Sequence, residues 1–332
     1  MTKSLGRGAL PADFRAVLLV GWAALTAAGL LYARFKQIPN SVAIPLLAGF
    51  LVEYPFYLVP AWADLRKRMA GRAFPLFLAL SFLLPYLACY GPASHLQFFH
   101  LVALAALAFA LGLWYFVLPV HPATDLAFLT FAGAILLSHF FESVYPPLYA
   151  HLPAAILGRL ALFEGVALVL MIQRGMAWTG YGFIPNLREW RIGALHYLAF
   201  LPLAACVAFP LKLVRRASPA PFWHTIGIFL AFLWVVALFE EFIFRGVLQQ
   251  WLEEWTGRFS SPLAPRTIAL LLTSLIFGAA HLWFRGFPNW RWALLAGILG
   301  WFCGHARNQA GGIRAGVVTH ALVVATWRGF FV

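Results

Sequence analysis

The sequence predicts an all-α protein that crosses a membrane many times. Of its 332 residues, 63% are hydrophobic and only 11% are charged, which is about half the charged fraction of a soluble domain. The mean hydropathy is +0.82 and the chain contains 14 Trp. Apolar runs that approach the roughly 20 residues of a membrane helix follow one another along the chain. These observations exclude a water-soluble globule and indicate a polytopic transmembrane helical bundle.

Proline, glycine and charged residues divide this sequence into about eleven apolar helices. Some of these can be re-entrant helices that do not cross the whole membrane. We expect them near residues 16–34, 41–62, 73–90, 97–119, 125–141, 153–172, 193–213, 222–252, 266–284, 291–305 and 313–327. The first run has no small-residue cleavage motif, so we expect a retained helix rather than a signal peptide. The polar interlude 173–191 is the best boundary between an N-terminal multi-helix membrane module of unknown role, 1–180, and a C-terminal core, 181–332.

The chain is strongly basic, with 24 Lys and Arg against 11 Asp and Glu and a net charge of +13. Most of this surplus lies in short stretches between apolar runs, where it orients helices and contacts anionic lipid headgroups. Lys3, Arg7 and the cluster 66–72 place the N-terminus in the cytoplasm. If every apolar run crossed the membrane in turn, the basic cluster 212–216 would lie outside the cytoplasm, against the rule that basic loops are cytoplasmic. Either one run does not cross or the rule does not hold there. No polar basic module suggests nucleic-acid binding.

Two adjacent carboxylates, Glu240 and Glu241, lie deep in the 222–252 run, with Arg245 one turn later. Ionisable groups inside apolar helices are costly, so each needs a partner or a function. The i, i+4 spacing lets Glu241 pair with Arg245, whereas Glu240 points about 100° away. The Glu241–Arg245 pair alone is also explained as a structural ion pair, but Glu240 has no partner on its own helix.

Two histidines, His281 and His320, lie inside the later runs. Glu240 precedes the polar connection 253–265 by about 13 residues and His281 follows it by about 16, which are similar depths in antiparallel helices. We therefore expect these two side chains to meet, with Glu241 and His320 lining the same cavity. A carboxylate in a low-dielectric site is a stronger base for activating water, and imidazoles can position that water or donate to an oxyanion.

Zinc is the competing use of these residues, because His281, His320 and either glutamate form a ligand set, although the HExxH spacing is absent. The three cysteines are far apart and indicate neither a disulfide framework nor a zinc site. The other intramembrane charges, Glu53, Arg159 and Glu164, are expected to be structural. Glu164 lies slightly off the helix face of Arg159, so an interhelical partner such as Glu53 is at least as well placed.

Over about residues 190–332 the chain resembles the CPBP family, which comprises type II CAAX prenyl endopeptidases and bacteriocin-processing proteins. The family motif EExxxR is matched by Glu240, Glu241 and Arg245, and FxxxH by Phe277 and His281. The resemblance implies a membrane-embedded glutamic protease. In it, Glu240 would activate water with the help of His281, while Glu241 and Arg245 would shape the site.

The third family motif, HxxxN or HxxxD, is matched only in part. His320 is present and would contribute to the oxyanion hole, but Val324 stands where the family has Asn or Asp. Asn308 is a candidate substitute donor. The loss of one donor is the strongest sequence argument for a catalytically silent relative.

The resemblance favours an intramembrane endopeptidase that uses water, with no cofactor and no metal. Its partners would be membrane lipids and a peptide or protein substrate, lipid-modified or carrying a C-terminal sorting segment. We expect a multi-pass protein of a bacterial inner membrane. The alternatives are a silent scaffold or immunity protein, and a transporter in which Glu240, His281 and His320 relay protons. No counterpart of the motifs precedes residue 180, which argues against the internal symmetry of a transporter.

Overall fold

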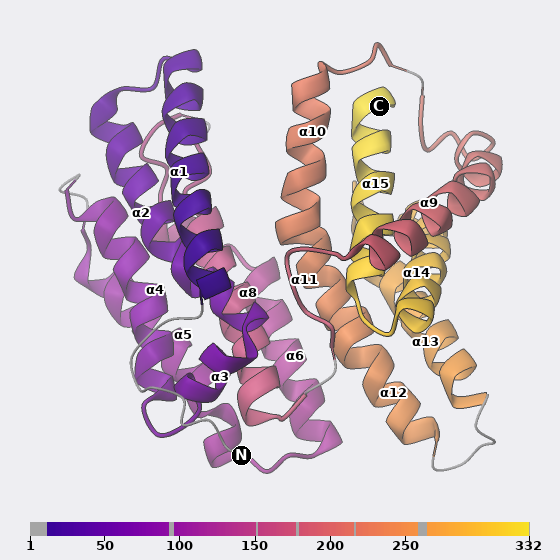
Figure 1. Cartoon of the computed structure of the whole chain (residues 1–332), viewed down its shortest axis with the longest axis horizontal. Coiled ribbons are helices and arrows are strands. Elements are labelled where there is room, and N and C mark those ends of the chain that lie inside the picture. The colour runs from indigo at the N-terminus through magenta and orange to yellow at the C-terminus, as the bar shows by residue number, and fades with distance from the viewer. Residues whose placement is uncertain are drawn as a thin grey trace. The chain divides into compact units, whose positions relative to one another are not determined.

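The computed structural model describes residues 12–92, 96–150, 152–176, 179–215, 217–257 and 264–331. No β-strand occurs in these ranges, and every apolar run expected from the sequence contains a helix, which confirms the all-α class. Lys3, Arg7 and Arg216, on which the predicted orientation partly depends, lie outside them, as do residues 258–263 of the 253–265 connection. The chain forms two compact units, Met1–Met176 and Ala177–Val332 (Figure 1).

Six helical segments among the described residues are long and apolar enough to cross a membrane. They are Ala12–Phe35, Asn40–Ala61, Phe98–Val117, Ile156–Gln173, Leu187–Ala208 and Phe222–Thr256. The bent pair Ala63–Met69 and Phe74–Tyr90 would add a seventh. The protein is therefore a polytopic helical membrane protein by the length and composition of its helices.

The N-terminal unit consists of helices joined by short connections. They are α1 (Ala12–Phe35), α2 (Asn40–Leu58), η1 (Val59–Ala61), α3 (Ala63–Met69), α4 (Phe74–Tyr90), α5 (Phe98–Val117), α6 (Pro122–Leu137), α7 (Phe140–Val144), α8 (Ile156–Leu168) and the π-helix η2 (Val169–Gln173). Helix α2 packs against α1, α4 and α8, and α4 also packs against α5. The interior is thus shared by α2, α4, α5 and α8.

The buried acids of the N-terminal unit do not pair as the sequence suggested. Arg159 forms its ion pair with Glu142 rather than with Glu53. Glu53 and Glu164 are almost completely buried, and none of their four carboxylate oxygens has a hydrogen-bond partner among the described residues. The expected pairing of Arg159 with Glu53 or Glu164 is wrong, because its guanidinium pairs with Glu142 on α7 instead.

The C-terminal unit is a second helical bundle. Its elements are α9 (Leu187–Ala208), α10 (Phe222–Ala231), η3 (Phe232–Val236), α11 (Ala237–Glu241), η4 (Phe242–Leu248), α12 (Gln249–Thr256), α13 (Ala264–Ala280), α14 (Trp290–Ala310) and α15 (Arg314–Phe330). Helix α14 packs against α13, α9 and α15, and α15 also packs against α9 and α10. A Cβ at Gly278 would lie 2.6 Å from the Ala293 carbonyl oxygen, so only glycine permits the close approach of α13 to α14.

One continuous helical segment, Phe222–Thr256, carries the two glutamates in its middle. The short helix α11, which ends with Glu240 and Glu241, lies between the π-helical segments η3 and η4. Figure 1 shows α11 between α10 and α12. Segments of π-helix add a residue per turn, turn side chains away from the regular α register and often occur at functional sites. The glutamates therefore lie on a short α-helical turn with irregular π-helical backbone on both sides.

Candidate active site

Glu241 is the buried anchor of the site. Its Oε1 atom accepts a hydrogen bond from Arg245 Nη1 at 3.1 Å, so the pair expected from the i, i+4 spacing is present. The same oxygen lies 2.9 Å from His320 Nδ1. Because a carboxylate accepts, this contact places the Nδ1 proton of His320 toward Glu241. One carboxylate on α11 thus fixes a guanidinium from η4 and an imidazole from α15.

Arg245 is held in place by more than its acid partner. Its Nη2 donates to the carbonyl oxygen of Gly300 on α14 at 3.0 Å. The guanidinium carbon also lies 4.3 Å from the ring centroid of Phe277, the first residue of the second motif. A desolvated cation over an aromatic face is attracted by about 2 kcal/mol. Arg245 therefore ties α11, α13 and α14 together around Glu241.

Glu240 faces a different environment from its neighbour. Its side chain is 31% exposed, whereas that of Glu241 is fully buried. Glu240 Oε2 lies 3.8 Å from His320 Nε2, which is too long for a direct hydrogen bond, and it has no hydrogen-bond partner among the described residues. One water can bridge two polar atoms at this separation. Glu240 and the outer edge of His320 are therefore free to act on a bound molecule.

Glu240, His281 and His320 line one cavity of about 380 Å³. His281 Nδ1 lies 2.8 Å from the Phe277 carbonyl oxygen, which can only accept, so His281 donates through Nδ1. In the neutral ring its Nε2 is then an acceptor. Glu240 and His281 thus border the same cavity, whereas a direct meeting of the two side chains stays a prediction.

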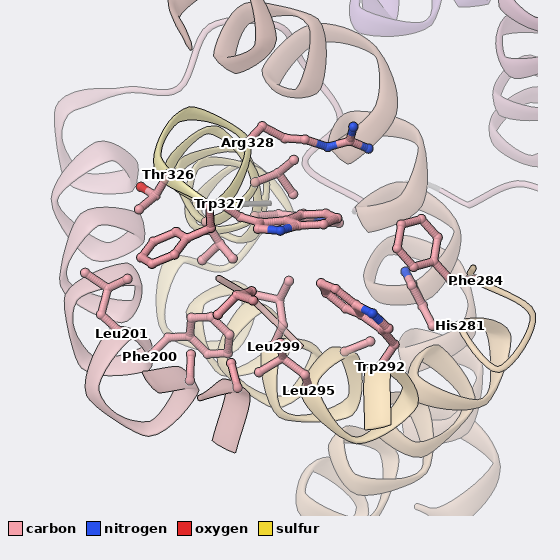
Figure 2. Close-up of a pocket in the computed structure, with 18 of the residues that line it drawn as sticks. Phe200, Leu201, His281, Phe284, Trp292, Leu295, Leu299, Thr326, Trp327 and Arg328 are labelled. Atoms are coloured by element: carbon pink, nitrogen blue, oxygen red, sulfur yellow. The ribbon is translucent and has the colours of Figure 1, made fainter. Parts of the chain in front are cut away.

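The rest of the cavity wall is mostly aromatic and aliphatic. Figure 2 shows Phe200 and Leu201 of α9 on one side and Trp292, Leu295 and Leu299 of α14 below. Phe284, which follows α13, and Trp327 of α15 complete the wall near His281. Besides the carboxylate and the two imidazoles, only Thr326 and Arg328 interrupt the apolar lining, which suits a long apolar ligand with a polar, reactive segment.

Residues 222–326 match the model of a protein family described as type II CAAX prenyl endopeptidase Rce1-like. This segment is Rce1-like. The match includes all the motif positions from Glu240 to Val324 and confirms the CPBP resemblance at the level of a membrane peptidase family. No curated protein and no solved structure matches the chain.

Two expectations for the Rce1-like segment are corrected by its geometry, those for Glu241 and Asn308, whereas His320 lines the cavity as expected. Glu241 does not line the cavity but lies behind it, because Arg245 and His320 hold its carboxylate inside the bundle. His320 is a buried partner of Glu241 as well as a cavity residue. Asn308 does not line the cavity, and its amide oxygen accepts hydrogen bonds from Gln249 and Arg307.

Val324 does face the cavity, at the position where the family has Asn or Asp. It follows His320 by one turn of α15, and only 7% of its surface is exposed. The position therefore points at the site, as the family motif implies, but it offers a methyl group in place of a hydrogen-bond donor.

Sequence reasoning missed two residues that shape the buried side of the site. Cys303 lies close enough that its sulfur, one Glu241 oxygen and one His320 nitrogen are all within 4.8 Å of one another. A Cβ at Gly316 would lie 3.0 Å from Glu241 Oε2, so this glycine makes room for the carboxylate. The three ligand types suit zinc, but Arg245 Nη1 lies 3.1 Å from Glu241 Oε1, and the positive charge of this guanidinium opposes a cation beside the carboxylate.

Proposed function

We propose that the Rce1-like segment is an intramembrane glutamic endopeptidase in which Glu240 activates the attacking water. The observation that carries this proposal is the convergence of Glu240, His281 and His320 on one apolar cavity inside a helical membrane protein. A peptidase needs a base within reach of water and donors within reach of the carbonyl oxygen. These three side chains supply both from three different helical segments.

The proposed reaction begins when the Glu240 carboxylate takes a proton from water and the hydroxide adds to the peptide carbonyl carbon. The carbon–nitrogen bond then breaks, and Glu240 returns its proton to the departing amine. His281 Nε2, an acceptor in the tautomer set by the Phe277 carbonyl, helps orient the water. No redox cofactor takes part in these steps.

His320 has a distinct proposed role, which its hydrogen bond to Glu241 defines. Because Nδ1 donates to Glu241, Nε2 offers a second N–H to the cavity only when the ring carries both protons. Such an imidazolium would be flanked by Glu241 and Glu240 and could donate to the developing oxyanion. Glu241 and Arg245 act as positioning residues, since neither lines the cavity.

The proposed substrate is a peptide or protein segment that the membrane delivers, either apolar itself or carrying a lipid group. The aromatic wall of the cavity supports this class, because burying an apolar chain there gains about 25 cal/mol per Å². A polar peptide would lose its hydration without compensation.

A second candidate, a catalytically silent relative that acts as a membrane scaffold, is favoured by one observation. Val324 faces the cavity where a donor is expected, so the oxyanion would depend on His320 alone at that end of the site. Removing one preorganised donor typically slows an enzyme by about 100-fold or more.

The test is to reconstitute the full chain in liposomes with bacterial membrane proteins and to map new peptide termini by mass spectrometry. Wild type should generate new termini and Glu240→Gln should not, because the amide keeps the shape and removes the base. Glu254→Gln is the matched control, since Glu254 is an exposed acid on the adjacent α12. Termini that persist with Glu240→Gln would refute the assignment of the base, and their absence with wild type would favour the silent relative.

A further inference from the structure

One end of the C-terminal unit gathers exposed basic side chains from several segments. At this end α9, α13 and α15 finish, and α10 and α14 begin. Ala208, Trp292 and Trp327 pack into one apolar cluster there, and Arg291 Nη1 donates to the Leu211 carbonyl oxygen at 3.4 Å. We call this the basic end, after its five exposed basic residues in the described ranges, which are Lys212, Arg215, Arg285, Arg291 and Arg328.

The five acids of the C-terminal unit all lie away from the basic end. Glu189 and Glu253 pair with arginines at the opposite end, where α9 begins and α14 finishes. The other three belong to the segment Phe222–Thr256, in its middle or near its far end. Within the described ranges, none of the five basic residues takes part in an ion pair. The basic end therefore presents positive charge without an acidic side chain to balance it.

Two of the five guanidinium groups stack on one aromatic cluster. The Trp292 and Trp327 rings are in direct contact, with centroids 4.7 Å apart, and Phe284 lies 5.4 Å from Trp292. The guanidinium carbon of Arg285 lies 5.5 Å from the Trp327 centroid and 5.7 Å from each of the other two. That of Arg328 lies 4.8 Å from Trp327, and Figure 2 shows it extending beside this ring. Stacking holds the two cations in place, and guanidinium N–H groups bind phosphate oxygens in pairs.

Exposed tryptophans accompany the basic residues at this end. Trp223, Trp283 and Trp290 expose 78%, 68% and 54% of their surfaces. Trp223 lies in the first turn of α10, and the other two lie in the loop before α14 and at its first residue. Indoles on the outside of a membrane protein are enriched at the boundary between hydrocarbon and headgroups. The anions at that level are lipid phosphates, and a lipid, unlike a soluble anion, also covers the indoles with its acyl chains.

We propose that the basic end binds the phosphate group of an anionic phospholipid, with Arg285 and Arg328 as its principal ligands. This inference does not depend on the proposed peptidase function, because the lipid contacts one end of the unit and not Glu240. It also gives the basic cluster that includes Lys212 and Arg215 a purpose other than the orientation of helices.

The test compares two lipids with the same acyl chains, dioleoyl phosphatidylglycerol, which is anionic, and dioleoyl phosphatidylcholine, which has no net charge. Their binding to the purified full chain in uncharged detergent is measured by native mass spectrometry. Binding is the readout because Arg328 also borders the cavity, so turnover would not isolate its contact with a lipid. The anionic lipid should bind about tenfold more tightly, a modest gain for two basic side chains near an anionic headgroup. Arg285→Gln/Arg328→Gln should bind both lipids equally.

Arg191→Gln/Arg266→Gln is the matched control, because both residues are exposed arginines near the starts of α9 and α13, at the opposite end. It removes the same charge and should keep the tenfold preference. A second variant, Lys212→Gln/Arg215→Gln, removes two charges from the basic end and leaves the stacked arginines in place. It should lower the preference to about threefold, and it tests the proposal even if the first variant does not fold.

Equal binding of the two lipids by wild type would overturn the proposal. So would a preference that survives Arg285→Gln/Arg328→Gln, or one that the control loses to the same extent. Glycerol 3-phosphate, which has the phosphate ester without acyl chains, is the third probe. If it binds as tightly as phosphatidylglycerol, the guanidinium groups hold a soluble phosphate ester and the assignment to a lipid is wrong. Much weaker binding of this probe, together with the preference for the anionic lipid, supports the proposal.

Discussion

The two glutamates of the C-terminal site and the two buried glutamates of the N-terminal unit, Glu53 and Glu164, have different surroundings. In the C-terminal unit, Glu241 has a guanidinium and an imidazole as partners, and Glu240 faces a cavity. In the N-terminal unit, Glu53 and Glu164 are buried to the same degree as Glu241, yet no described residue hydrogen-bonds to their carboxylate oxygens. A buried acid inside an apolar helix is therefore no evidence of a catalytic site by itself.

What separates the two regions is the arrangement around the acids. A carboxylate with fixed partners stays ionised at low cost and orients its neighbours. An acid without partners in an apolar interior favours its neutral form and contributes a desolvation penalty. The comparison predicts opposite responses to one substitution, Glu to Met, which keeps a similar volume and removes the charge.

The largest effect on stability is expected for Glu241→Met. The substitution leaves Arg245 and His320 buried without their acid, and breaking a buried pair in this way costs about 3–5 kcal/mol. The melting temperature and the yield in detergent should fall sharply. Glu240→Met is the control, because this residue touches the cavity and has no direct hydrogen bond to lose. Equal stability of both variants would contradict the anchoring role of Glu241.

The next largest effect is expected on the rate of turnover when Val324 is replaced. Val324→Asn should raise turnover by up to about 100-fold if the oxyanion lacks a donor there. Val323→Asn also places an amide at the cavity wall and controls for added polarity. Asn308→Ala should leave the rate unchanged, since Asn308 is outside the cavity. A wild type that is already fast and insensitive to His320→Ala would show that other donors hold the oxyanion.

In the N-terminal unit, Glu164→Met should change the free energy of unfolding by less than Glu241→Met does, and in the opposite direction. Replacing a buried carboxyl group that has no hydrogen-bond partner by an apolar chain should stabilise the unit by about 1–2 kcal/mol. Thermal unfolding measures this, with Glu142→Met as control, because Glu142 is exposed and its ion pair with Arg159 contributes little. A lower melting temperature or a loss of turnover would show that the N-terminal acids have a role of their own.

The smallest effect is expected for metal removal. Prolonged treatment with a strong chelator should leave turnover within about a factor of two, because the positive charge of Arg245 beside Glu241 opposes a second cation at this carboxylate. Activity is compared before and after dialysis with and without added zinc. Stoichiometric zinc whose removal and return track activity would instead favour the metallohydrolase version of the site formed by Glu241, Cys303 and His320.

Local sequence patterns determined the helical class, the positions of the apolar helices and the pairing of Glu241 with Arg245. All three follow from interactions within a few residues, namely hydropathy over a membrane-length window and side-chain spacing on one helix face. The motifs around Glu240, His281 and His320 also indicated the peptidase family, over the segment 222–326 that the family model matches. The divergence of Glu240 from Glu241 follows from the helical turn between adjacent residues.

Only the tertiary structure decided which groups from distant helices meet. The contact of His320 with Glu241 joins residues 79 positions apart, and Arg285 and Arg328 converge on Trp327 from a loop and a helix. It also assigned Asn308 to a hydrogen-bond cluster with Gln249 and Arg307 instead of the cavity. Periodicity sets the face of a helix on which a side chain lies, but helix crossing and close packing at small residues such as Gly316 set what that face touches.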